Sequence, residues 1–128
     1  MLKKFLLLNF KLSMAFDRVF VPKSMQIYGT SDFHKRLLPE YITNDAKVYD
    51  IGGGKNPHIF PNMKASRNIT SIGVDIDQSE LNKAPEGGYD SVICADITDT
   101  QGPKDGDFVI SRATLEHVKD GKAAIENM

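Results

Sequence analysis

The chain has 128 residues, of which 41% are hydrophobic and 26% are charged. These values are ordinary for a globular protein and exclude extended disorder and a collagen-like repeat, while the length allows one domain at most. Its 16 basic and 17 acidic residues leave a formal net charge of −1, which argues against nucleic acid as a partner. The single cysteine, Cys94, excludes an internal disulfide, and we expect a cytoplasmic protein.

The N-terminal segment predicts an amphipathic helix that ends at Pro22. Its apolar residues recur at steps of three and four: Phe5, Leu8, Leu12, Phe16 and Val19. The basic residues Lys4, Lys11 and Arg18 recur every seven residues on another face. We expect a packing helix whose basic face is solvated; the alternatives are weak contact with an anionic membrane surface and a secretory signal, whose apolar run Asn9 would interrupt. No apolar run reaches the roughly 20 residues that a membrane-spanning helix needs.

A second helix is predicted to begin near Ser31, whose hydroxyl suits the N-cap position, and to end at a turn around Asn44. The apolar residues expected along it are Phe33, Leu37 and Tyr41 on one face, with Leu38 and Ile42 beside them. Residues 1–45 are therefore expected to form a helical cap, separate in character from residues 46–128.

Four strands are predicted after this cap, over residues 47–51, 70–76, 91–95 and 107–111. The last three have nearly continuous apolar centres, as strands buried on both faces do. The connections between the strands are mostly long enough for helical crossovers. The sequence therefore predicts an α/β protein with a Rossmann-like parallel sheet behind two N-terminal helices.

A run of three glycines, Gly52 to Gly54, closes the first predicted strand, in the place where open parallel sheets bind ligands. The dinucleotide fingerprint needs a third glycine where this chain has Pro57, and it fails again in the other register at Lys55. A phosphate loop of the Walker type is also missing, because no Gly-Lys-Ser or Gly-Lys-Thr follows.

The residue pattern instead favours a nucleoside ligand without phosphates. Asp50 stands two residues before Gly52, where a carboxylate suits a ligand that carries an ammonium group. Asp75 lies 21 residues after Gly54, at the end of the second strand, where a carboxylate can accept hydrogen bonds from ribose hydroxyls. Asp96 and Ile97 end the third strand. We expect the carboxylate of Asp96 and the backbone N–H of Ile97 to form hydrogen bonds with the nucleobase of the ligand.

Four successive segments resemble, in order and spacing, the motifs of class I S-adenosylmethionine (SAM)-dependent methyltransferases. They are Asp50–Gly54, Gly73–Ile76, Ala95–Ile97 and Asp107–Ser111, the last followed by Thr114–Val118. The resemblance covers about residues 46–128. It implies a Rossmann-like methyltransferase domain, SAM as the cofactor and methyl transfer to an acceptor that we expect to be a small molecule.

The resemblance also implies roles for individual residues. Gly52 and Gly54 would pass under the methionine part of SAM, with Asp50 near its amino group. Asp75 would hold the ribose, while Asp96 and Ile97 would frame the adenine. Ser111 and Arg112 would face the methionine end and the acceptor. The expected cofactor-binding set is Asp50, Gly52, Gly53, Gly54, Asp75, Ile76, Asp96, Ile97, Ser111 and Arg112.

The chain departs from the family pattern in two places. Asn56 stands where the family often has a third glycine; Asn56 and Pro57 suit an N-cap and a first helical position, but Pro61 then shortens or kinks that helix. The family sheet has seven strands, and only the half in the order 3-2-1-4 is predicted here. We therefore expect a fragment of a longer protein, with the C-terminal strands missing and a last helix over residues 120–128.

His117 is the one histidine near the expected acceptor side, and it is a weak candidate for a catalytic base. His34 and His58 are expected to be surface or capping residues, and no pair of His or Cys residues has metal-ligand spacing. The N-terminal helices are expected to cover the cofactor and part of the acceptor pocket. Two alternative functions stay open, an NAD-dependent oxidoreductase and a non-catalytic module that binds a nucleoside or assembles with a partner.

Overall fold

The computed structural model describes residues 2–26 and 29–128. The chain divides into two compact units, residues 1–37 and residues 38–128, so each unit is described by itself. All the regular secondary structure described in the first unit is helical, and the second unit contains the sheet. The first unit ends eight residues before the end of the predicted cap at residue 45 (45 − 37), inside the second helical segment.

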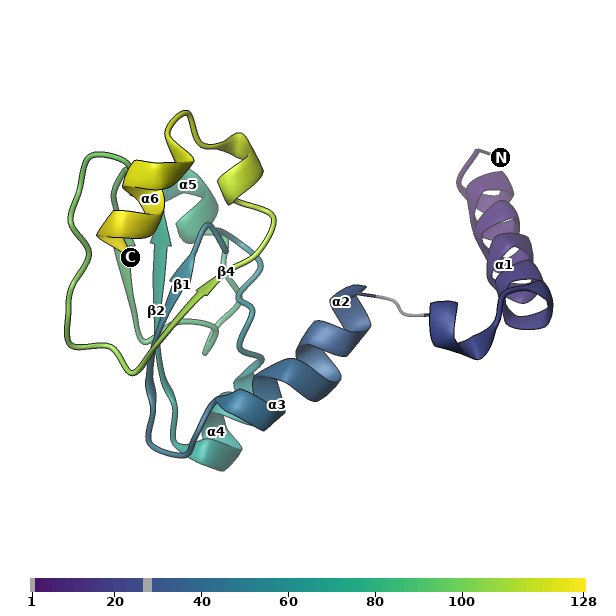
Figure 1. Cartoon of the computed structure of the whole chain (residues 1–128), viewed down its shortest axis with the longest axis horizontal. Helices are drawn as coiled ribbons and strands as arrows, with labels where there is room; N and C mark the ends of the chain where they lie inside the picture. Colours follow the sequence, from purple (N-terminus) through teal and green to yellow (C-terminus); the bar gives the residue numbers. More distant parts are fainter. Residues whose placement is uncertain (1, 27–28) are drawn as a thin grey trace. The chain divides into compact units, whose positions relative to one another are not determined.

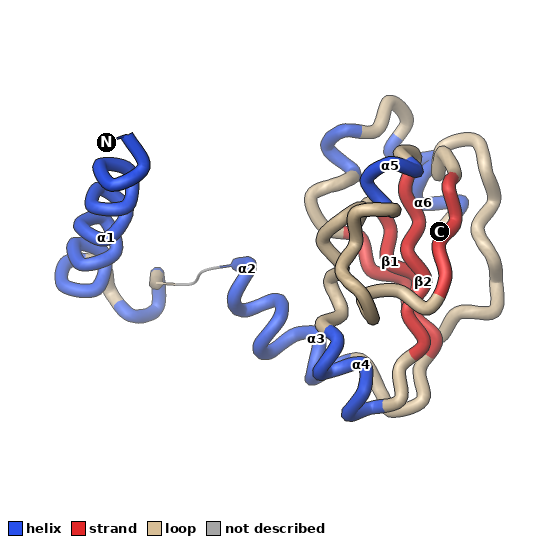
Figure 2. Tube along the Cα trace, turned by 180° about the vertical axis from the view of Figure 1, so that it is seen from behind, coloured by secondary structure: helices blue, strands red, loops and turns tan. Residues whose placement is uncertain are grey.

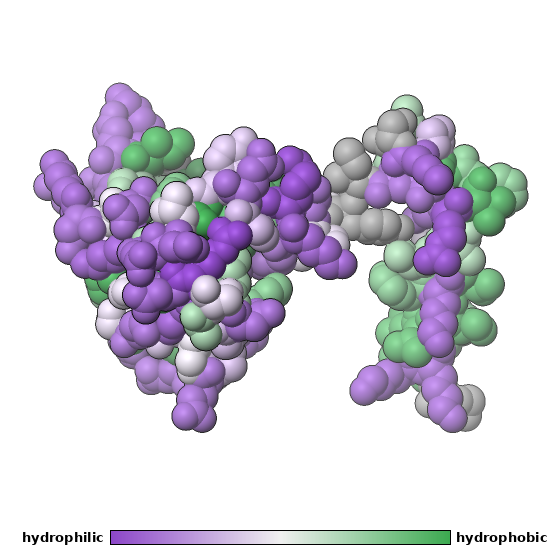
Figure 3. All heavy atoms as spheres, turned by 90° about the horizontal axis from the view of Figure 1, so that it is seen from below, coloured by the Kyte–Doolittle hydropathy of each residue, from purple (hydrophilic) through white to green (hydrophobic). Residues whose placement is uncertain are grey.

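The first unit begins with one long helix, α1, from Leu2 to Phe20, as the apolar spacing predicts. Its polar residues form a stripe with apolar side chains on both sides (Figure 3). The side-chain amide of Gln26 donates to the carbonyl oxygen of Asp17 at 3.0 Å and also to that of Val21. The carbonyl of Asp17 also accepts the backbone N–H of Val21 at 3.0 Å, so Gln26 adds hydrogen bonds at the end of the helix, where carbonyl groups have fewer partners. None of the helices described has both the length and the apolarity to cross a membrane.

The second helical segment differs from its prediction. The short 3-10 turn η1 (Lys23–Met25) follows α1, and helix α2 (Gly29–Asp32) already includes Ser31, which is therefore not its N-cap. A π-helical turn, η2 (Phe33–Leu37), leads into α3 (Leu38–Tyr41). Because a π-turn adds one residue to a helical turn, it rotates the apolar face. Leu38 and Ile42 are buried as a result, while Tyr41 is exposed.

The second unit is built on a four-stranded parallel sheet in the order β3-β2-β1-β4 (Figures 1 and 2). The strands are β1 (Lys47–Ile51), β2 (Thr70–Asp75), β3 (Ser91–Cys94) and β4 (Phe108–Ser111). Ile51 lies opposite Val74 on one side and Ser111 on the other, so the carboxyl ends of these strands lie together. The predicted strands and their order are confirmed.

The core of the sheet lies on its two central strands. Tyr49, Ile51, Ile72 and Val74 are buried together. The prediction that the later strands are buried on both faces is wrong for β3 and β4, where Val92 and Val109 are 41% and 43% exposed. Both strands are edges of the sheet, and each therefore has a neighbour on one side only. Cys94, which a central strand would bury, is exposed for the same reason.

Helices follow three of the four strands: α4 (Pro61–Arg67) comes after β1, α5 (Gln78–Leu81) after β2 and α6 (Gly121–Asn127) after β4. Helix α4 links β1 to β2, and helix α5 contacts β2 and β3. The chain ends in the 3-10 turn η3 (Leu115–His117) and helix α6, which confirms the last predicted helix. The predicted N-cap at Asn56 is wrong, because α4 begins with Pro61 at a position where the missing N–H needs no partner.

Candidate functional site

A pocket of about 590 Å³ lies at the carboxyl ends of the strands. This volume falls in the range of small-molecule and cofactor sites. Six residues that the sequence pointed to line it: Gly52, Asp75, Ile76, Asp96, Ile97 and His117. Thr114 and Lys119 line it too, and neither of them has a role predicted from the sequence. The crevice where parallel sheets bind ligands therefore exists in this chain and has the dimensions of a nucleoside site.

Asp75 ends β2 and is held by the turn that follows it. Its Oδ1 accepts the backbone N–H of Asp77 at 2.9 Å, which orients the carboxylate at the mouth of the pocket. Asp77 is the N-cap of α5 and accepts the N–H groups of Ser79 and Glu80 at 2.7 and 3.3 Å. A Cβ at Gly54 would lie 3.2 Å from Asp75 Oδ2, so the glycine loop runs directly beside this carboxylate.

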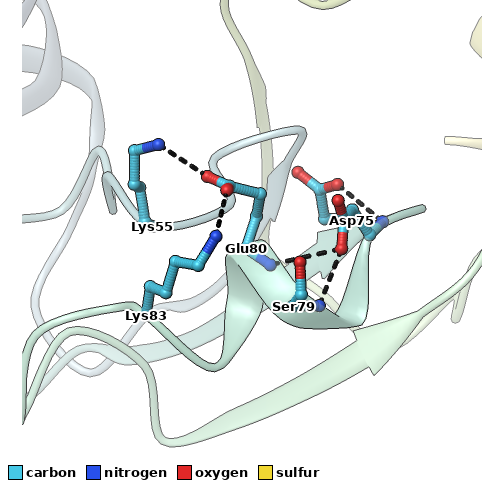
Figure 4. Close-up of polar contacts among 6 residues, drawn as sticks. Lys55, Asp75, Ser79, Glu80 and Lys83 are labelled. Atoms are coloured by element: carbon cyan, nitrogen blue, oxygen red, sulfur yellow. Dashed lines mark hydrogen bonds and ion pairs between the residues drawn. The ribbon is translucent and has the colours of Figure 1, made fainter.

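Glu80 connects α5 to the glycine loop through two ion pairs. Its carboxylate lies 2.8 Å from Lys55 Nζ and 2.7 Å from Lys83 Nζ, and both lysines point toward it (Figure 4). The same two lysines, Lys55 first, lower the pKa of Glu80. Because Lys55 directly follows Gly54, this pair fastens the loop to the helix that follows Asp75. Exposed ion pairs of this kind add little stability, so their main effect here is to orient the glycine loop relative to α5.

Asp96 lies in the same pocket on the turn after β3. Its Oδ1 accepts the backbone N–H of Thr98 at 2.8 Å and the Thr98 hydroxyl at 2.7 Å. These two hydrogen bonds, the backbone one first, lower the pKa of Asp96, so its carboxylate stays charged to a lower pH than that of an ordinary aspartate. Asp99 also lines the pocket, so three carboxylates face one lysine there. This balance favours a ligand that carries positive charge.

Removing the Thr98 hydroxyl tests this account of Asp96. In a Thr98→Val chain we expect the pKa of Asp96 to rise part of the way to its ordinary value, because the backbone N–H bond remains. A carboxyl with a lowered pKa stabilises the fold above its unfolded-state pKa, and that contribution disappears as the pH falls through the folded value. Carbon-detected NMR titration of the carboxyl measures the shift. An unchanged pKa in the variant would contradict the assigned cause.

The glycine loop is tightly packed where it enters the pocket. Gly52 and Gly54 both have positive φ angles, of 75° and 51°. The N–H of Gly52 donates to Val74 O at 2.7 Å, and the Thr114 hydroxyl donates to Ile51 O at 3.2 Å. A Cβ at Gly52 would lie 2.1 Å from Thr114 Oγ1. Thr114 therefore packs over the loop from the segment after β4, a contact that spacing along the sequence does not reveal.

Asp50 lies behind the loop instead of in the pocket lining. It is fully buried, and its Oδ2 accepts the backbone N–H of His58 at 2.7 Å. Its Oδ1 lies 2.6 Å from His58 Nδ1. The prediction that His58 is a surface or capping residue is wrong, since it is only 7% exposed. The buried carboxylate of Asp50 explains this burial, because such a charge needs hydrogen-bond donors close by.

The remaining expected cofactor residues lie outside the pocket lining as the described residues define it: Gly53, Gly54, Ser111 and Arg112. Gly53 and Gly54 continue the loop. Ser111 ends β4 opposite Ile51, and its hydroxyl is buried with no hydrogen-bond partner among the residues described. Over the same residues, no cluster of three His, Cys, Asp or Glu side chains could hold a metal ion.

Comparison with known proteins agrees with this arrangement. A family model described as the methyltransferase domain matches residues 49–128. Among solved structures, the chain is similar to a TehB-like SAM-dependent methyltransferase from Corynebacterium glutamicum, with 18% sequence identity and a TM-score of 0.56. The alignment covers 93% of this chain and 62% of that protein, so the chain spans less than two thirds of its length. No curated protein matches the sequence. The chain belongs to the methyltransferase domain family, and its sheet has the α/β fold of class I SAM-dependent methyltransferases.

Proposed function

We propose that this chain binds SAM at the carboxyl ends of its strands and serves methyl transfer to a small-molecule acceptor. The observation that carries the proposal is the pocket of about 590 Å³ into which Asp75 and Asp96 project from successive strands. In this proposal Asp75 accepts the ribose hydroxyl hydrogen bonds, and Asp96 receives the amino group of adenine. Ile76 and Ile97 supply apolar walls on either side of the base.

The proposed reaction requires the protein mainly to align the methyl donor with the acceptor. When bound, SAM would supply a methyl group carried on a positively charged sulfur, which the acceptor would take in exchange for the carbon–sulfur bond. The pocket residues hold the donor in line with the acceptor and keep water out. The acidic lining suits the positive charge of the donor. His117 is the proposed proton acceptor where the methyl acceptor must lose a proton, since it lines the same pocket.

An NAD-dependent oxidoreductase is the competing function, and one feature of the chain argues against it. Dinucleotide sites hold the pyrophosphate at the N-terminus of the helix that opens directly from the glycine loop. Here helix α4 begins only at Pro61, after a non-helical stretch that includes the buried His58. The acidic pocket would also repel a pyrophosphate. These features favour the adenosyl ligand over the dinucleotide.

Calorimetric titration of the chain with S-adenosylhomocysteine (SAH) and, separately, with NAD⁺ tests the proposed function. Circular dichroism first confirms that the sample is folded. We expect SAH to bind at least tenfold more tightly than NAD⁺, because only SAH avoids placing phosphates near Asp75 and Asp96. Equal or tighter binding of NAD⁺ would contradict the proposal. Absence of binding by either ligand would favour a non-catalytic module instead.

A further inference from the structure

A buried polar cluster lies behind the glycine loop, outside the pocket lining. Asp50 on β1 is its centre, and both the backbone and the ring of His58 bind its two carboxylate oxygens, at 2.7 and 2.6 Å. The hydroxyl of Tyr89 donates to Oδ2 from the other side at 3.5 Å. In the short contact a carboxylate oxygen faces a ring nitrogen, and we assign the ring N–H of His58 as the donor.

This cluster joins the two ends of the segment that contains the glycine loop. Asp50 stands two residues before the first glycine and His58 four residues after the last, and the two are joined by two hydrogen bonds, which leaves the intervening segment little freedom. A Cβ at Gly53 would lie 2.9 Å from Asp50 Oδ1 and 2.4 Å from the Tyr89 hydroxyl, so the middle glycine packs directly on the cluster. Within the loop, Asn56 N–H donates to Gly53 O at 2.9 Å. The conformation of the loop therefore depends on the position of the Asp50 carboxylate.

The burial of the cluster limits which groups can replace its hydrogen bonds. Burial, and after it the negative charge of Asp50, raises the pKa of Tyr89, which keeps its hydroxyl as a donor. Asp50 is fully buried and His58 nearly so, so water is a poor substitute for either partner. Without the ring N–H, Oδ1 would lose the donor that holds it.

We propose that His58 is a positioning residue for the cofactor loop: its ring N–H holds the Asp50 carboxylate, and through it the backbone of Gly52–Gly54, in the conformation that binds the adenosyl ligand. This rests on the proposed function, since it deepens the account of the same site. His58 acts through Asp50 and touches no ligand itself.

Two substitutions of His58 separate positioning from bulk packing. Asn at this position places an amide N–H the same number of bonds from Cα as Nδ1, whereas Gln places it one bond farther, where Nε2 was. His58→Asn therefore preserves the donor to Asp50, and His58→Gln displaces it. SAH affinity is measured by calorimetry on both variants and on the unsubstituted chain. Hydrogen exchange of residues 51–58 is followed by mass spectrometry in the same three samples.

We expect the His58→Asn chain to bind SAH within threefold of the unsubstituted chain, and the His58→Gln chain to bind at least tenfold more weakly. Exchange in residues 51–58 should be at least tenfold faster in the Gln variant alone, while the strands stay protected. Equal affinity and equal exchange in all three chains would overturn the inference. Loss of the fold in both variants would overturn it too, because His58 would then be needed for folding.

Failure of the proposed function gives a different result. If the unsubstituted chain binds no SAH but the exchange of residues 51–58 still separates Asn from Gln, the cluster holds the loop and the ligand assignment is wrong. If SAH binds the unsubstituted chain and both variants alike, the ligand assignment stands and the role of His58 is wrong.

Discussion

Replacing Gly52 with alanine is expected to destabilise the fold and abolish tight SAH binding. The φ angle of Gly52 is 75°, a conformation that costs a residue with a side chain about 1 kcal/mol or more. The added Cβ would also lie 2.1 Å from Thr114 Oγ1, so the loop or the segment after β4 must move. Together these effects should lower the free energy of unfolding by about 2–4 kcal/mol. Urea denaturation measures the loss of stability, and calorimetry measures the loss of affinity.

Gly121→Ala is the matched control for this substitution. A Cβ at Gly121 meets nothing within 4 Å, and this glycine lies at the start of α6. Exchanging glycine for alanine in a helix at a site without steric conflict should change the free energy of unfolding by less than about 1 kcal/mol, in the stabilising direction. SAH affinity should not change. If the two variants show the same changes in the free energy of unfolding and in SAH affinity, the inferred close packing of Thr114 over the loop would be contradicted.

Replacing Asp75 with asparagine is expected to weaken SAH binding by about tenfold to 150-fold, with the fold intact. Losing one charged hydrogen-bond acceptor to a ligand costs about 1.5–3 kcal/mol, which corresponds to that range. Asparagine keeps an oxygen for the N–H of Asp77, which donates to Oδ1 at 2.9 Å in the structure, so the turn into α5 should survive. Calorimetric titration with SAH measures the effect.

Asp77→Asn serves as the control for Asp75. The two residues are neighbours on one turn, and asparagine is as good an N-cap as aspartate, so α5 should keep its start. Asp77 lies outside the pocket lining, and we expect SAH to bind this variant as it binds the unsubstituted chain. An equal loss of affinity in both variants would mean that the turn, and not the Asp75 carboxylate, determines binding.

The parallel sheet could be predicted because the patterns that indicate each strand lie within short stretches of sequence. Each strand appears as a short apolar run, and the long connections require crossovers. The N-cap role of Asp77 follows from the same local chemistry, since a short acidic side chain suits the position before a helix. Local patterns were less reliable where tertiary position decides: the edge positions of β3 and β4 leave exposed the residues that their apolar runs suggest are buried.

The site was predicted in part for the same reason. Asp75 and Asp96 line the pocket because Asp75 is the last residue of β2 and Asp96 lies two residues after the end of β3. The His58–Asp50 contact has no sequence signature, because it depends on how the loop folds back on β1. Thr114 reaches Ile51 from 63 residues away, across a strand pair that forms only in the sheet. The roles expected for Asp50, Ser111 and Arg112 in cofactor binding, and for the N-terminal helices over the cofactor, stay predictions.

Mapping SAH onto the chain by NMR tests the central claim most directly. A uniformly ¹⁵N-labelled sample is titrated with SAH, and the backbone amide shifts of the second unit are followed. We predict saturable shifts concentrated at Gly52, Asp75, Asp96 and Ile97, whose side chains or backbones line the pocket. Saturable binding with shifts confined to other parts of the chain, or no shift at any ligand concentration, would contradict the assignment of this pocket to the adenosyl ligand.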